Sequence, residues 1–199
     1  MWLELDGLNN LRDLGGMPTR DGGRIAPGRL WRSDNLQDLG PAQFDLLRDW
    51  GLTDVIDLRT HFELDGSPSP ARGLDGIAYH HHSYFREAED DDEEILDKAL
   101  PWVGYEASVT NNDPTTASYL SFMADRPDSV VAALRAVANA RGAALVQCAA
   151  GKDRTGLTVA LALSLAGVDE AGIVADYALT TERIQAVVER MWASSTYAS

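Results

Sequence analysis

Cysteine is nearly absent from this chain, which has one thiol, Cys148, in 199 residues. A lone cysteine excludes an intramolecular disulfide and is typical of a reducing compartment. Basic residues are also few, with 17 Lys and Arg against 31 Asp and Glu, so the formal net charge is −14. This charge argues against nucleic acid or an anionic membrane as a general partner. A site for an anion would therefore be a small cluster of basic groups on an otherwise acidic surface.

Long hydrophobic runs are missing as well. No apolar run approaches the roughly 20 residues that cross a bilayer, so we expect no integral membrane segment. Residues 1–6 lack the basic and apolar regions of a signal peptide. We therefore expect a cytoplasmic protein. The alternative is export by a route that needs no signal peptide. The hydrophobic fraction of 45% allows a substantial core, and we expect one domain over residues 1–199.

The most informative stretch is residues 146–156, Val-Gln-Cys-Ala-Ala-Gly-Lys-Asp-Arg-Thr-Gly. The apolar segment just before it is typical of a short buried strand, and the one after it of a core helix. This order places loop amides at a helix N-terminus, where N–H groups and the helix dipole hold an anion. Cys148 is the candidate nucleophile, and the guanidinium of Arg154 can grip two phosphate oxygens.

Phosphoryl transfer suits the residue types in this loop. A helix N-terminus and nearby cations favour the thiolate, the nucleophilic form of cysteine. Thr155 can donate its hydroxyl towards the sulfur. The alternative is a buried structural cysteine, the commoner fate of a lone thiol. The glycines, the basic residues and the strand–helix context favour a phosphate site instead, with substrate bound by Ala149, Ala150, Gly151 and Lys152.

These residues carry a family resemblance. Cys-x5-Arg-Thr resembles the signature of the cysteine-dependent protein tyrosine phosphatases. The fuller loop string is similar to the bacterial members that also act on serine/threonine phosphates and phosphoinositides. Segments 10–16, 30–33, 55–59 and 176–177 match in the family's order. The resemblance implies a phosphatase with a cysteinyl-phosphate intermediate. We expect no cofactor and no metal, because Arg154 and the loop amides supply the positive field.

Two departures from the family pattern concern the substrate. Gln147 stands where the superfamily usually has His, so its side chain can orient the loop but carries no charge. Ala149 stands where phosphoinositide phosphatases often have a second loop lysine. With the acidic composition, this favours phosphotyrosine in proteins, with phosphoserine and phosphothreonine as further substrates. The alternatives are a phosphoinositide phosphatase of the same mechanism and a catalytically silent phosphate-binding module.

Asp153 and Asp57 are the main candidates for the general acid that protonates the leaving oxygen. Asp113 and the acidic run at residues 87–94 are the remaining alternatives. The Trp-Pro-Asp loop of other tyrosine phosphatases is absent, and the resemblance implies that the position of Asp153 can serve instead. Asp57 follows a predicted strand at residues 53–58, and Arg59 next to it is counted with the substrate-binding residues. If that strand is parallel to the one before Cys148, both end at the same edge of the sheet. An ion-pair role is the alternative for Asp153, with Lys152 or Arg59 as partner.

The run of three histidines and the run of acidic residues can both be explained without a metal site or a catalytic role. Of the three consecutive histidines, only His80 and His82 share one face of a strand, and no Cys or Glu-x-x-His partner accompanies them. We therefore do not predict a metal site. Residues 87–94 hold seven acids and precede a helix-like apolar pattern. They are interpreted as a solvated helix face, or as part of a helical lid in an insertion at about residues 86–112.

The predicted fold is α/β, similar to the protein tyrosine phosphatases, with a central mixed sheet of four or five strands flanked by helices. Arg12, Asp13, Arg32 and Asp34 are expected to form charge pairs that brace the loops near the N-terminus. Helices are predicted near residues 41–50, 114–123, 127–142, 157–166, 169–179 and 181–192, and strands near 24–26, 29–32, 53–58, 77–82 and 143–146.

Overall fold

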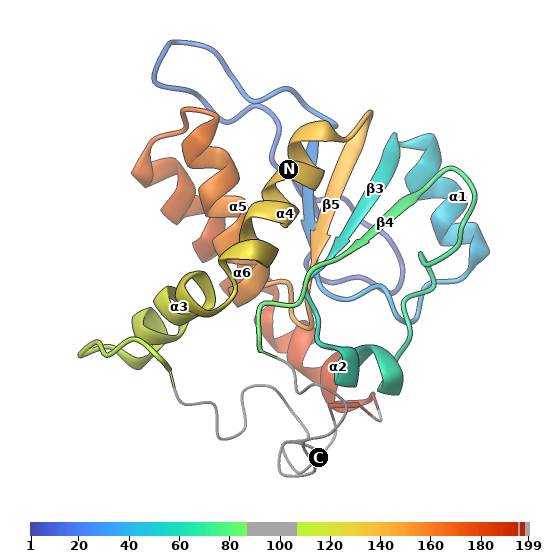
Figure 1. The fold of residues 1–199 in the computed structure, drawn as a ribbon. Helices are drawn as coiled ribbons and strands as arrows, with labels where there is room; N and C mark the ends of the chain where they lie inside the picture. Colours follow the sequence, from blue (N-terminus) through green and yellow to red (C-terminus); the bar gives the residue numbers. More distant parts are fainter. Residues whose placement is uncertain (87–106, 195, 198–199) are drawn as a thin grey trace.

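The computed structural model describes residues 1–86, 107–194 and 196–197 (Figure 1). The helix expected after the acidic run, and with it most of the proposed lid insertion, lies outside the described residues. Among the described helices, none combines the length and the apolar character that a bilayer crossing requires.

Five strands form one mixed sheet in the spatial order β1-β2-β5-β3-β4. β2, β5, β3 and β4 are parallel, and β1 pairs with β2 in the antiparallel sense. β5 is central, so its carboxyl end lies between the ends of two parallel neighbours. The predicted α/β class is confirmed. The strands are β1 (Arg12–Asp13), β2 (Leu30–Ser33), β3 (Leu52–Asp57), β4 (Ala78–His81) and β5 (Ala143–Gln147).

Helices begin where proline and aspartate residues in the sequence predicted their N-termini. Asp113 and Asp169 each cap a helix by accepting a backbone N–H, from Thr116 and Gly172 respectively. The helices are α1 (Pro41–Asp49), α2 (His61–Gly66), α3 (Pro114–Asp125), α4 (Pro127–Asn139), α5 (Asp153–Leu165) and α6 (Glu170–Trp192).

Two sequence-based expectations about elements are wrong, and one helix was missed. Residues 24–26 are not a strand, since Arg24 makes only an isolated bridge to Pro18. The two helices predicted over residues 169–192 are one helix, α6. Thr180, near the predicted break, is buried and accepts a hydrogen bond from Arg12 instead of capping a new helix. Helix α2 was not predicted.

Apolar side chains cover both faces of the sheet. One core lies between the sheet and helices α4 and α5, and a second lies on the α1 side. Side chains of β5 alternate between them: Val146 belongs to the first core and Leu145 to the second. Cys148 belongs to the first core and is only 3% exposed. The loop that begins at Cys148 is therefore anchored in a packed sheet.

Candidate active site

The loop between β5 and α5 lies at the carboxyl edge of the sheet. We call residues 148–154 the phosphate loop. Its first residue, Cys148, directly follows β5, and its last two belong to the first turn of α5. The Gly156 N–H donates to the Lys152 carbonyl oxygen at 2.8 Å, closing the first helical turn. The N-terminal end of α5 therefore adjoins the thiol, as the sequence predicted.

Buried polar side chains hold the loop carbonyls on its outer side. Asn35 donates to the Ala149 oxygen from its side-chain amide at 3.1 Å and from its backbone at 3.0 Å. Asn10 donates to the oxygens of Ala150 and Gly151 at 3.0 and 3.1 Å. In a trans peptide, the C=O and the following N–H point in opposite directions. The amides that follow these carbonyls are thus turned away from their buried partners, which is the arrangement an anion needs.

Two arginines complete this support. Arg32 donates to the Gly151 oxygen at 2.7 Å and pairs with Asp176 at 2.7 Å. Arg12 pairs with the other oxygen of Asp176 at 2.8 Å. Burial, and then the positive charge of Arg32, lower the pKa of Arg12 to about 10. The expected charge pairs with the aspartates near the N-terminus are therefore wrong, because both arginines share a carboxylate from α6.

Gly151 is required by close packing as well as by its backbone angle. Its φ is 65°, in the region that L side chains rarely adopt. A Cβ at this position would lie 2.1 Å from the Ser33 carbonyl oxygen, which belongs to the backbone of β2. The loop can therefore lie directly against β2 only with glycine here.

Arg154 is fixed by a buried carboxylate that we did not identify from the sequence. Its Nη1 and Nη2 lie 2.6 and 2.9 Å from the two carboxylate oxygens of Glu63 on α2, a paired contact. Burial alone would lower the pKa of Arg154, but the charge of Glu63 outweighs it and raises that pKa above its ordinary value. The guanidinium of Arg154 therefore stays charged, and its paired contact with Glu63 fixes its orientation.

Glu63 is itself held on several sides. Its Oε2 accepts from the Thr60 backbone N–H at 2.8 Å, and its own N–H donates to Thr60 Oγ1 at 3.2 Å. The Tyr197 hydroxyl donates to Glu63 Oε1 at 3.1 Å. Thr60 and Glu63 form a capping box, and Thr-x-x-Glu was the signal in the sequence that could have revealed both α2 and this residue.

Asp153 occupies the exposed side of the loop. Its Oδ1 accepts a hydrogen bond from Tyr119 at 2.5 Å and lies 3.3 Å from the Tyr177 hydroxyl. The ammonium of Lys152 is 3.9 Å from the same oxygen. The side chain of Asp153 is 47% exposed, so solvent and a substrate can reach it.

Comparisons with known proteins agree with this geometry. A family model described as "Tyrosine phosphatase family" matches residues 3–198. The chain belongs to the tyrosine phosphatase family. This confirms the resemblance drawn from its motifs.

Similar known proteins include bacterial phosphatases. The phosphatase is 33% identical to a Mycobacterium tuberculosis protein named "Triple specificity protein phosphatase PtpB", over 91% of this chain and 70% of that protein. It is 28% identical to a Cupriavidus necator protein named as a tyrosine-protein phosphatase, over 91% of this chain and 63% of the relative. A "Tyrosine-protein phosphatase" of Nostoc commune is 30% identical over 77% of this chain and 49% of its own length. The phosphatase thus spans 49% to 70% of the length of these relatives.

Asp57 and Arg59 reach the same sheet edge as the phosphate loop but are fully buried against each other. Arg59 Nη2 lies 2.9 Å from Asp57 Oδ2, and Tyr79 donates to the same oxygen at 3.0 Å. Burial would raise the pKa of Asp57, but Arg59 outweighs it and holds that pKa below its ordinary value. A charged, enclosed carboxylate is poorly suited to donate a proton. The arrangement therefore favours Asp153 over Asp57 as the acid of the phosphatase.

The two residues that flank the phosphate loop, Gln147 and Thr155, have buried polar side-chain atoms without a hydrogen-bond partner within the described part of the chain. Thr155 Oγ1 is one, so the expected hydrogen bond to the sulfur of Cys148 is not formed in this structure. The other is the amide of Gln147. Since side chains alternate along β5, Gln147 shares a face with Leu145 in the second core. It therefore lies on the opposite face of the sheet from Cys148.

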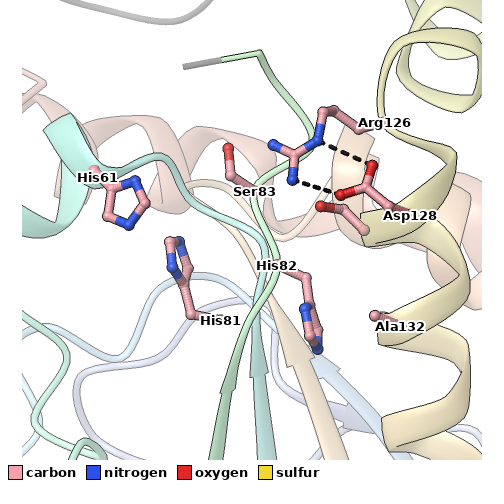
Figure 2. A pocket seen from close by; sticks show the side chains of 8 residues that line it. His61, His81, His82, Ser83, Arg126, Asp128 and Ala132 are labelled. Atoms are coloured by element: carbon pink, nitrogen blue, oxygen red, sulfur yellow. Dashed lines mark hydrogen bonds and ion pairs between the residues drawn. The ribbon is translucent and has the colours of Figure 1, made fainter. Parts of the chain in front are cut away.

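A hollow of about 380 Å³ lies at the carboxyl end of β4, and two of the three consecutive histidines line it (Figure 2). His81 and His82 point to opposite sides of the strand end, as the alternation predicts. His81 donates to the Arg59 carbonyl oxygen at 2.6 Å, and Arg126 pairs with Asp128 at 2.9 Å. His80 is bonded to Asp54 instead. Over the described ranges, no group of three or more side chains suited to a metal ion is found.

Proposed function

We propose that the phosphatase hydrolyses phosphate monoesters in two steps, with Cys148 as nucleophile and protein phosphotyrosine as the main substrate. The observation that carries this proposal is the outward anchoring of three loop carbonyls by Asn10, Arg32 and Asn35. It leaves the loop amides, together with Arg154, as preorganised partners for the phosphate oxygens. Such preorganised donors stabilise charge in the transition state without rearrangement during the reaction.

In the first step, the Cys148 thiolate attacks phosphorus and an S–P bond forms while the P–O bond to the leaving group breaks. Asp153 gives its proton to the leaving oxygen as that bond breaks. In the second step, water attacks phosphorus, Asp153 takes a proton from that water, and the S–P bond breaks. Inorganic phosphate and the Cys148 thiolate are the products.

The preference for protein substrates is supported by charge. The loop has one lysine, Lys152, and the chain carries a formal net charge of −14, which disfavours an anionic membrane surface. The name of the Mycobacterium relative includes "triple specificity", which supports assaying phosphoserine, phosphothreonine and phosphoinositides beside phosphotyrosine. A phosphoinositide phosphatase of the same mechanism is the second candidate.

The central test is hydrolysis of para-nitrophenyl phosphate by the wild type and three variants, with and without a chelator. Cys148→Ser should lose turnover but keep vanadate binding, because the amides and Arg154 remain. Arg154→Ala should lose both. Arg183→Ala is the matched control, since it removes an arginine whose pair with Glu4 is exposed. Turnover by Cys148→Ser at the wild-type rate would remove the nucleophile from the proposal. A wild-type protein that binds vanadate without turnover would be the silent binding module.

A leaving-group series tests the acid. A general acid contributes roughly 10²–10⁴ in rate, and less for a leaving group that needs no proton. Asp153→Asn should therefore slow phenyl phosphate far more than para-nitrophenyl phosphate. Equal losses with both esters would take the acid role away from Asp153. A panel of phosphotyrosine, phosphoserine and phosphothreonine peptides and phosphoinositide vesicles then decides the substrate class.

A further inference from the structure

Two tyrosines from different helices meet at Asp153. Tyr119 on α3 donates to Asp153 Oδ1 at 2.5 Å. The Tyr177 hydroxyl on α6 lies 2.6 Å from the Tyr119 hydroxyl and 3.3 Å from Asp153 Oδ1. Each phenol has one proton. Since that of Tyr119 goes to the carboxylate, Tyr177 donates to the Tyr119 oxygen, its shorter contact. The result is a chain of donors from Tyr177 through Tyr119 to Asp153.

We propose that Tyr119, supported by Tyr177, is a positioning residue that occupies Oδ1 of Asp153 and leaves Oδ2 to carry the catalytic proton. This inference rests on the proposed function of Asp153 as the general acid. Nothing in the described part of the chain donates to Oδ2. When Oδ2 gives its proton to the leaving oxygen, negative charge develops on the carboxylate, and the O–H of Tyr119 stabilises it at Oδ1. In the second step, Oδ2 takes the proton back from the attacking water.

The two phenols are held in place without help from Asp153. The ring of Tyr119 stacks on Phe122 at a centroid distance of 6.2 Å and meets the ring of Tyr177 edge-on at 6.5 Å. Burial, followed by the hydrogen bond to Asp153, raises the pKa of Tyr119, and burial raises that of Tyr177. Both therefore stay protonated donors over the working pH range. A change to phenylalanine removes a hydroxyl and keeps a packed ring.

The charged and titratable groups that face Asp153 are few. Lys152, on the neighbouring position, brings its ammonium to 3.9 Å from Oδ1. Tyr119 and Tyr177 are the others that the described residues place against it. Lys152 is 40% exposed, so solvent screens its charge. The hydrogen bond from Tyr119 is therefore the main directional contact of the carboxylate.

The kinetic test compares Tyr119→Phe, Tyr177→Phe and Ser118→Ala with the wild type. Tyr119→Phe should lower kcat for phenyl phosphate by about tenfold, a fraction of the general-acid effect, and change para-nitrophenyl phosphate little. It should also move the alkaline limb of the kcat–pH profile to higher pH, because a carboxylate with one donor fewer holds its proton more strongly. Tyr177→Phe acts through Tyr119 and should have a smaller effect. Ser118→Ala, the control on α3, removes a hydroxyl bonded to the Pro114 carbonyl and should change nothing.

The double variant Tyr119→Phe/Asp153→Asn separates positioning from a general structural role. If Tyr119 acts through Asp153, its substitution has no further effect once the acid is gone. The same loss in both backgrounds, or an unmoved alkaline limb in Tyr119→Phe, would overturn the proposal.

A measurement without turnover keeps this test independent of the proposed function. The ¹³C carboxyl resonance of Asp153 can be assigned by its loss in Asp153→Asn and followed at neutral pH. It should shift in Tyr119→Phe and stay in place in Ser118→Ala. An unchanged resonance in Tyr119→Phe would refute the contact even in an active enzyme. A shifted resonance in a chain without phosphatase activity would refute the proposed function and leave the contact standing.

Discussion

The substitution Glu63→Gln tests whether the buried ion pair with Glu63 holds Arg154 in place. It keeps the shape of the side chain and removes its charge. Glu63 is fully buried, and the Arg154 side chain is 5% exposed. Removing one partner of a buried ion pair costs about 3–5 kcal/mol, because the remaining charge is left uncompensated. The amide oxygen of glutamine can still accept one N–H from Arg154. We therefore expect a loss near the lower end, about 3 kcal/mol in the free energy of unfolding.

For a chain of this size, 1 kcal/mol corresponds to a change in Tm of about 2–4 °C, so Tm should fall by about 6–12 °C. Thermal unfolding followed by circular dichroism measures this shift. Glu4→Gln is the matched control, because it changes the same residue type in an arginine pair whose glutamate is 72% exposed. Its Tm should stay at the wild-type value. If the two variants unfold at the same temperature, the buried pair does not stabilise the site as argued.

The pH dependence of the free energy of unfolding is a second test of the pair between Glu63 and Arg154. Burial would raise the pKa of Glu63, but Arg154 outweighs it and holds that pKa below the ordinary value of 4.5. A carboxyl with a lowered pKa contributes stability above its ordinary value, and this contribution is lost as pH falls through the folded value. The stability difference between wild type and Glu63→Gln should therefore be full at neutral pH and shrink in acid. Urea unfolding from pH 7 downwards measures it, and a difference independent of pH would contradict the charge argument.

Two further predictions follow from the same edge of the sheet. Gly151→Ala should abolish phosphate binding and turnover, because its Cβ would lie 2.1 Å from the Ser33 carbonyl oxygen. Gly22→Ala is the control: Gly22 has a positive φ and open space around it, so the variant should lose only about 1 kcal/mol in the free energy of unfolding and keep its activity. Phosphate binding and kinetics of both variants check this. Asp57→Asn should lower Tm by several degrees, since it leaves Arg59 buried without its charge partner, and should show no stronger effect on phenyl phosphate than on para-nitrophenyl phosphate. A strong leaving-group dependence in Asp57→Asn would return the acid role to Asp57.

Local chemistry explains which parts of the fold were predictable. Pro41, Pro114 and Pro127 begin helices where the sequence places them, because proline at the first helical position loses no hydrogen bond. The buried strand before Cys148 was recognisable from its apolar run alone. The continuity of α6 was not, since the buried Thr180 between the two predicted helices accepts a hydrogen bond from Arg12, which is 168 residues away in the chain.

The phosphate loop could be recognised from the sequence alone. Its cysteine, glycines and arginine are contiguous, and their spacing is sufficient to indicate a strand, a tight turn and a helix start. Tertiary structure decided everything that depends on partners distant in the chain. It set Glu63 behind Arg154, turned the loop carbonyls towards Asn10 and Asn35, and separated the two candidate acids. Asp57 became a buried partner of Arg59, and Asp153 became a half-exposed acceptor of a tyrosine hydroxyl. The burial and the partners of a carboxylate depend on packing between elements and not on its neighbours in sequence.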